Sequence, residues 1–206
     1  MSRRPLSYMF GPEGETQMVS RQLLDAVVAD VRRHCQARGY SEGPGINNFV
    51  PHDAVAAFGM AELLVAAGFD RYLSIAPEGH IYGYFFEQLG VPVLSVFTDY
   101  PPTQISAEDD LRDLRDRRVL LIEDDVIGGR TLRLVVEHLR QFSPASLALY
   151  LGHTKGIQHV QNVPPGIERV FVAEDCLSFG VRPELEKCFE AFFGRCQRVA
   201  ASVAEP

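Results

Sequence analysis

The sequence lacks the features that would mark a membrane protein or a nucleic-acid-binding protein. No run of about eighteen apolar residues occurs, as a membrane-spanning helix would need. Lysine occurs only at Lys155 and Lys187, and the net charge is −7, which disfavours a broad footprint on a phosphate backbone. The opening MSRRPLSYMF has no long apolar core or small-residue cleavage site. We therefore expect a cytoplasmic protein whose partner is a small molecule, with no membrane and no nucleic acid.

Disulfide frameworks and cysteine-based metal sites are also disfavoured. The four cysteines, Cys35, Cys176, Cys188 and Cys196, show neither CxxC spacing nor the density of a disulfide scaffold, so we expect reduced, packed thiols. No internal repeat and no Pro/Gly/Ser-rich linker divides the 206 residues. The sequence predicts a single domain over residues 1–206.

What the sequence does have is an alternation of amphipathic helices and short apolar strands. Helices are predicted over 15–38, 54–69, 81–90, 131–142 and 183–202, and strands over 71–76, 93–97, 119–123, 146–152 and 169–175. This alternation predicts an α/β fold with a mostly parallel sheet covered by helices on both faces. The charged, proline-bearing segment 99–118 is predicted to be a functional or mobile insertion.

The most informative stretch is VLLIEDDVIGGRTL, residues 119–132. A buried strand ends there in Glu123, Asp124 and Asp125, where unpaired charge is costly, and the chain then turns through two glycines into a helix. In an open parallel sheet, ligands lie beyond the carboxyl ends of the strands, and a helix start offers free N–H groups to an anion. Carboxylates beside such a cradle suit a phosphorylated sugar, directly or through a divalent metal.

On these residues the chain resembles the type I phosphoribosyltransferases. Four apolar residues, two acids, a short turn and then Gly129, Arg130 and Thr131 are similar to that family's signature for phosphoribosyl pyrophosphate (PRPP). The turn PEGH at residues 77–80 is similar to the family's pyrophosphate loop, and segment 99–118 to its mobile loop. The resemblance implies a Rossmann-like fold with a small hood from residues 1–50 and 153–182. It also implies a PRPP- and magnesium-dependent pentosyltransferase, a homodimer, that transfers phosphoribosyl to a base, with a purine-like base favoured.

The resemblance also implies a role for each matching residue. The strand-end acids Glu123, Asp124 and Asp125 would be catalytic, with Glu123 and Asp124 binding the ribose hydroxyls directly or through Mg²⁺. The 5-phosphate would be bound by Ile127, Gly128, Gly129, Arg130 and Thr131. The pyrophosphate would be bound by Ala76, Pro77, Glu78, Gly79 and His80. The base would be bound by Lys155, Glu174 and Asp175. Further positive charge for the pyrophosphate would come from His80 or from Arg112, Arg115, Arg117 and Arg118.

Two other hypotheses stay open. Ile127 stands where purine-salvage members often carry an aspartate, and PEGH is an acidic version of the family's pyrophosphate loop. The chain could therefore instead bind PRPP or a nucleotide as a regulator, or act on a different phosphosugar. The run LLIEDD also resembles the acidic pocket of a receiver domain. That reading needs a phospho-accepting Asp after the next but one strand, and it ranks below the transferase.

Overall fold

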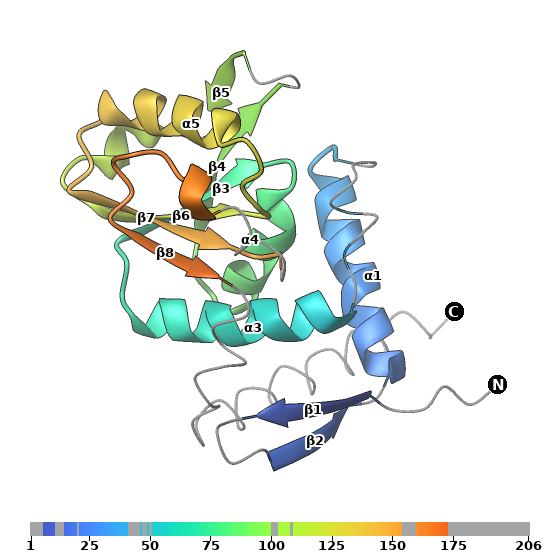
Figure 1. The fold of residues 1–206 in the computed structure, drawn as a ribbon. Coiled ribbons are helices and arrows are strands. Elements are labelled where there is room, and N and C mark those ends of the chain that lie inside the picture. The colour runs from blue at the N-terminus through green and yellow to red at the C-terminus, as the bar shows by residue number, and fades with distance from the viewer. Residues whose placement is uncertain are drawn as a thin grey trace.

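The computed structural model describes residues 6–10, 15–19, 21–40, 46, 49, 51–99, 103–107, 109–153 and 160–172. Its centre is a six-stranded sheet in the order β5-β4-β3-β6-β7-β8 (Figure 1). Every neighbouring pair is parallel except β4 and β5. The strands are β3 (Arg71–Ala76), β4 (Val93–Thr98), β5 (Ile105–Ala107), β6 (Arg118–Glu123), β7 (Ser146–Leu151) and β8 (Arg169–Val172). The predicted α/β fold is confirmed.

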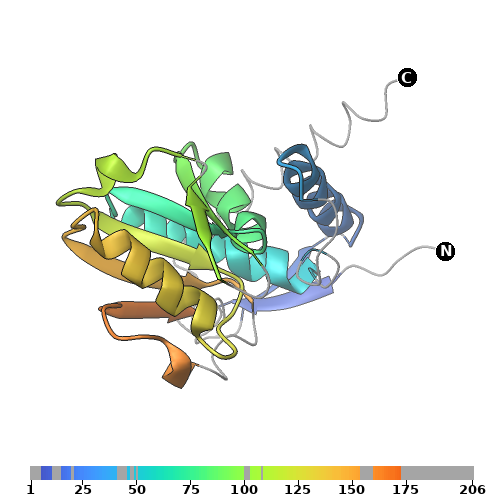
Figure 2. The same ribbon diagram turned by 90° about the horizontal axis from the view of Figure 1, so that it is seen from above.

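Helices cover both faces of this sheet (Figure 2). On one face, α3 (Pro51–Ala66) and α4 (Gly79–Gln88) pack in a cluster that includes Leu120 and Ile122 of β6. On the other face, α5 (Arg130–Arg140) packs in a cluster that includes Val119 and Leu121. Successive side chains of a strand point to opposite faces, so β6 must be apolar at every position between these layers. All four of these β6 residues are fully buried.

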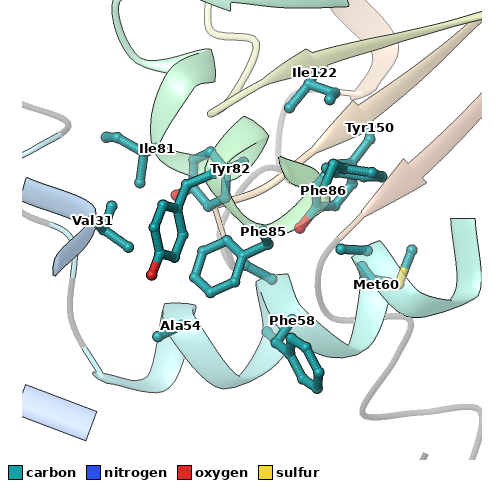
Figure 3. Packing of buried hydrophobic residues seen from close by; sticks show 14 of the residues in the cluster. Val31, Ala54, Phe58, Met60, Ile81, Tyr82, Phe85, Phe86, Ile122 and Tyr150 are labelled. Atoms are coloured by element: carbon teal, nitrogen blue, oxygen red, sulfur yellow. The ribbon is translucent and has the colours of Figure 1, made fainter. Parts of the chain in front are cut away.

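Aromatic side chains form much of the core between α3, α4 and the sheet (Figure 3). Phe86 lies 6.0 Å from Tyr150 of β7 between ring centroids, and Phe85 lies 6.2 Å from Phe49. Both phenylalanines of α4 are fully buried, although they are adjacent in the sequence.

The first predicted helix begins later than expected. Residues 15–19 form strand β2 (Glu15–Val19), which pairs antiparallel with β1 (Leu6–Phe10) in a separate two-stranded sheet. Helix α1 (Arg21–Ala37) follows and packs against α3 and α4. Short apolar runs do not distinguish helix from strand by spacing alone, and here the pairing with β1 decides the outcome. The predicted helix 183–202 lies outside the described residues.

Segment 99–118 has more structure than a mobile insertion. Its described part contains the edge strand β5 and the 3-10 helix η1 (Leu111–Leu114), whose two leucines are buried. The Asp109 side chain accepts a hydrogen bond from the Ser95 N–H of β4 at 2.8 Å. Strand pairing and buried leucines thus attach this segment to the sheet.

Candidate functional site

The candidate site lies where the strand order of the sheet reverses. From β3 the chain crosses to β4 on one side, whereas β6 lies on the other side of β3 and leads on to β7 and β8. Strands β3 and β6 are parallel neighbours, with Ser74 paired to Ile122, so their carboxyl ends meet at one edge. In open α/β sheets, ligands bind in the crevice at this kind of reversal. The topology therefore brings the turn 77–80 beside the acids 123–125.

Glycine permits this close approach of the two loops. A Cβ at Gly79 would lie less than 3.0 Å from the backbone oxygen of Ile122, nearer than real Cβ atoms come. Gly79 begins α4, and Glu78 precedes it as the N-cap without making a side-chain capping bond. The Glu78 carboxylate therefore does not cap the amino end of α4. The peptide bond between Ala76 and Pro77 is cis.

Burial and neighbouring carboxylates raise the pKa values of two acids at this edge, Glu123 and Glu78. Burial, then the charge of Asp124, a hydrogen bond with Asp124 and the charge of Glu78 raise the pKa of Glu123 well above its usual value. Burial and the charges of Asp124 and Asp125 likewise raise the pKa of Glu78. Glu123 is only 9% exposed, and its Oε2 has no hydrogen-bond partner in the described part of the chain. The three acids 123–125 and Glu78 thus lie near one another at this edge of the sheet.

Residues 123–125, which we call the acidic loop, have their backbone held by the end of β7. The N–H groups of Gly152 and His153 donate to the carbonyl oxygens of Glu123 and Asp124, both at 2.8 Å. The Asp125 N–H donates to Asp124 Oδ1 at 2.7 Å. A Cβ at Gly152 would overlap the ring of Tyr82, so this glycine lets the chain pass over α4. The sequence analysis missed Gly152 and Tyr82, because only the folded chain brings them together.

The proposed phosphate loop, residues 127–131, runs into the first turn of α5. Val126 is buried, Ile127 and Gly128 are exposed, and Gly129 adopts a left-handed φ of 67° as the N-cap of α5. Glycine is the residue best suited to that φ. The first N–H groups of a helix have no partners within it and can bind an anion. Arg130 is exposed and Thr131 half-buried in this first turn.

His80 differs from its predicted surroundings. It is buried, and its Nδ1 and Nε2 are hydrogen-bonded to the hydroxyls of Ser74 (2.9 Å) and Ser95 (3.1 Å). Its ring centroid lies 5.1 Å from that of Tyr40. The histidine thus connects α4 to β3 and β4 inside the protein, and its ring nitrogens bond to these serines instead of to pyrophosphate as predicted.

The arginines expected to neutralise pyrophosphate lie at the wrong end of the sheet. Arg118 begins β6, roughly 16 Å along the strand from Glu123 at about 3.3 Å per residue. Its N–H donates to Asp70 at 2.8 Å, and its guanidinium donates to the Gly68 carbonyl. Arg112 forms an ion pair with Asp110 at 2.6 Å. The expectation is wrong because η1 leads into the amino end of β6, whereas the acids follow its carboxyl end. The predicted base-binding residues Lys155, Glu174 and Asp175 lie outside the described residues.

The segment that carries the acidic loop matches a known family. Residues 86–162 match the family model of the phosphoribosyl transferase domain. The resemblance read from residues 119–132 is therefore confirmed. This phosphoribosyl transferase segment runs from the end of α4 to Asn162 and contains the acids and the phosphate loop, but not the turn 77–80. No curated protein matches the chain.

Three solved structures are similar to the chain at low identity. A purine phosphoribosyltransferase from Pyrococcus horikoshii Ot3 is 20% identical, with a TM-score of 0.43 over 57% of this chain and 78% of that one. A hypothetical protein from Neisseria gonorrhoeae with bound ppGpp is 17% identical, with a TM-score of 0.42 over 57% and 75%. A hypoxanthine-guanine phosphoribosyltransferase from Bacillus anthracis is 12% identical, with a TM-score of 0.44 over 59% and 77%. These identities are too low to transfer an activity.

The carboxylates at the site are oxygen ligands of the kind that Mg²⁺ prefers. Among the described residues, no three His, Cys, Asp or Glu side chains are already arranged to hold a metal. Mg²⁺ is usually held by one or two carboxylates together with water and substrate phosphates, so a complete protein cage is not needed. The unpartnered Oε2 of Glu123 and the mutually repelling Glu78 and Asp124 provide such oxygens.

None of the described helices is long and apolar enough to cross a membrane.

Proposed function

We propose that the protein is a magnesium-dependent phosphoribosyltransferase, which transfers 5-phosphoribosyl from PRPP to a nitrogenous base, with a purine-like base favoured. The observation that carries the proposal is the meeting of two loops at the strand-order reversal: the acidic loop of the phosphoribosyl transferase segment and the turn after β3. Together they offer carboxylates, a glycine-rich helix start and a second backbone turn. PRPP needs these three kinds of partner for its ribose hydroxyls, its 5-phosphate and its pyrophosphate.

In this proposal the chain acts by positioning and by exclusion of water. Glu123 and Asp124 accept hydrogen bonds from the ribose hydroxyls, and the N–H groups of residues 127–131 bind the 5-phosphate. Residues 76–79 lie against the pyrophosphate. The bond between the anomeric carbon and the pyrophosphate oxygen breaks, a bond to the base nitrogen forms, and that nitrogen loses its proton to the released pyrophosphate. Bound Mg²⁺ would supply charge neutralisation of the leaving pyrophosphate.

The proposal also covers the setting of the protein. We propose a homodimer that acts on small molecules in the cytoplasm, without a membrane or nucleic-acid partner. The net charge of −7 and the scarcity of lysine support this partner class. Sedimentation analysis of the purified chain would test the dimer, and a single species of 22.9 kDa would contradict it.

A second candidate is supported by Glu78. Its carboxylate has a raised pKa beside Asp124 and Asp125, and it belongs to the turn that would face pyrophosphate. A negative charge there favours a ligand without pyrophosphate, such as a phosphorylated ribose or a nucleotide that acts as a regulator. The receiver reading is disfavoured, since β7 separates β6 from β8 and an aspartate after β8 would not lie beside Glu123.

Calorimetric titration with PRPP, with and without Mg²⁺, would test the main proposal. Binding that needs Mg²⁺, followed by pyrophosphate release with a purine base, would support transfer. Equal affinity for ribose 5-phosphate and PRPP would favour the second candidate, because the pyrophosphate would then contribute nothing. Absence of binding to either ligand would overturn the main proposal and the phosphorylated-ribose form of the second candidate.

A further inference from the structure

Asn162 contacts the proposed phosphate loop at two points. Its side-chain Nδ2 donates a hydrogen bond to the carbonyl oxygen of Ile127 at 2.5 Å. Its own backbone oxygen lies against Gly129, where a Cβ would come closer than 3.0 Å. These contacts fall on either side of Gly128, so Asn162 spans the tip of the loop. The two segments are 35 residues apart in the sequence.

Asn162 is itself held by the core. Val160 and Val163, on either side of it, pack against the cluster beneath α5, and the Val163 N–H donates to the Val160 carbonyl at 3.1 Å. Pro164 is buried. Further along, a Cβ at Gly166 would lie 3.3 Å from Val136 of α5. Residues 160–166 therefore form a strap that follows α5, and we call them the α5 strap.

The tip of the loop is poorly anchored by its own side chains. The side chain of Ile127 is 67% exposed, and a Cβ at Gly128 would meet no atom within 4 Å. The buried neighbours that fix the chain are Val126 before the tip and Leu132 after it. A loop with an exposed tip of this kind samples several backbone conformations unless another segment fixes it. Asn162 supplies that restraint from the α5 strap.

We infer that Asn162 is a positioning residue for the phosphate-binding loop, an inference that rests on the proposed function. A peptide carbonyl that faced the 5-phosphate would repel it, and the Asn162 amide engages the Ile127 carbonyl instead. With that oxygen occupied, the loop presents N–H groups to the anion. Asn162 therefore pre-organises the loop and lowers the entropic cost of binding. In this role it acts through the loop and not by contact with PRPP or the base.

The test measures PRPP affinity in the presence of Mg²⁺ by calorimetry for the wild type, Asn162→Ala, Asn162→Asp and Gln161→Ala. Asn162→Ala loses one restraining hydrogen bond, so its affinity for PRPP should be about fivefold to tenfold lower than that of the wild type. Asn162→Asp should weaken it further, because an acceptor then faces the carbonyl and a charge lies near the phosphate. Gln161 is the exposed neighbour on the same turn, so Gln161→Ala should bind as the wild type does. In turnover, the KM for PRPP should rise while the KM for the base stays unchanged.

A second readout does not depend on PRPP. The amide chemical shifts and relaxation of Gly128 and Gly129 in ligand-free, ¹⁵N-labelled protein should change in Asn162→Ala and not in Gln161→Ala. If the wild type binds PRPP and Asn162→Ala binds it within twofold, the positioning role is overturned. If the wild type does not bind PRPP, the proposed function fails. The glycine amides then still decide whether Asn162 fixes the loop, and unchanged amides would overturn this role as well.

Discussion

The Cα of Gly79 lies against the carbonyl oxygen of Ile122, so closely that no Cβ fits between them. This contact fixes the turn after β3 against the strand end that carries Glu123. The two glycines of α4, Gly79 and Gly83, therefore differ in how much room they leave for a side chain. A Cβ at Gly83 would lie 3.5 Å from Ser74 and Val93, which is ordinary van der Waals contact.

Gly79→Ala should therefore destabilise the protein or displace the turn, whereas Gly83→Ala should not. We expect Gly79→Ala to lower the free energy of unfolding by about 2 kcal/mol, the scale of an overpacked site. Gly83→Ala, inside the same helix, should be neutral or raise it by up to about 1 kcal/mol through helix propensity. Urea denaturation of both variants measures the difference, and equal stabilities would contradict the contact.

Asp124→Asn should abolish PRPP binding and turnover, because it removes a carboxylate expected to accept from the ribose hydroxyls or to contact Mg²⁺. Calorimetry with PRPP and Mg²⁺ measures the binding. The matched control is Glu137→Gln, which neutralises an exposed acid on α5 and should leave binding unchanged. Retained turnover in Asp124→Asn would remove this residue from the site.

Glu78→Gln should reduce the dependence of PRPP binding on Mg²⁺. The variant removes a negative charge that neighbours Asp124 and Asp125, so the pyrophosphate meets less repulsion when no cation is present. We expect PRPP affinity without Mg²⁺ to rise several-fold, while affinity with saturating Mg²⁺ changes little or falls. Titrations at several Mg²⁺ concentrations measure this. A Mg²⁺ dependence equal to that of Glu137→Gln would show that Glu78 does not face the ligand.

Glu123→Gln should make stability less sensitive to pH. The pKa of Glu123 lies well above its usual 4.5 in the folded protein. Between pH 4.5 and the folded pKa, the folded state therefore keeps a proton that the unfolded chain has released. Stability from this group is therefore present below pH 4.5 and is lost as pH rises through the folded pKa. Above the folded pKa the variant should be more stable by about 1 kcal/mol, because a buried carboxylate then no longer carries an uncompensated charge.

Thermal unfolding from pH 4.5 to pH 8 measures the effect of Glu123→Gln. The wild-type midpoint should fall across this range more steeply than that of the variant. Added Mg²⁺ should raise the wild-type midpoint more than that of the variant, since the carboxylate is its expected contact. Parallel curves for the two proteins would place the titrating acid elsewhere.

The sequence by itself determined the local elements and the chemistry of one loop. Apolar runs of strand length separated by amphipathic helices predicted the parallel sheet, since these periodicities are local properties of the chain. The stretch 119–132 predicted its strand, turn and helix, and the residues of that stretch carried the resemblance that the family match confirmed. The helix predicted over 15–38 was partly wrong, because pairing with β1 decides the state of residues 15–19.

Only the tertiary structure decided which segments meet. The order of strands in the sheet places the turn 77–80 beside Glu123 and puts Arg118 at the opposite end of β6. Packing buries His80 between Ser74 and Ser95, where a turn histidine beside pyrophosphate had been expected. The contact of Asn162 with Ile127 joins positions that no local pattern connects. Periodicity reports which face of an element is buried, whereas strand order and long-range packing fix what that element lies against.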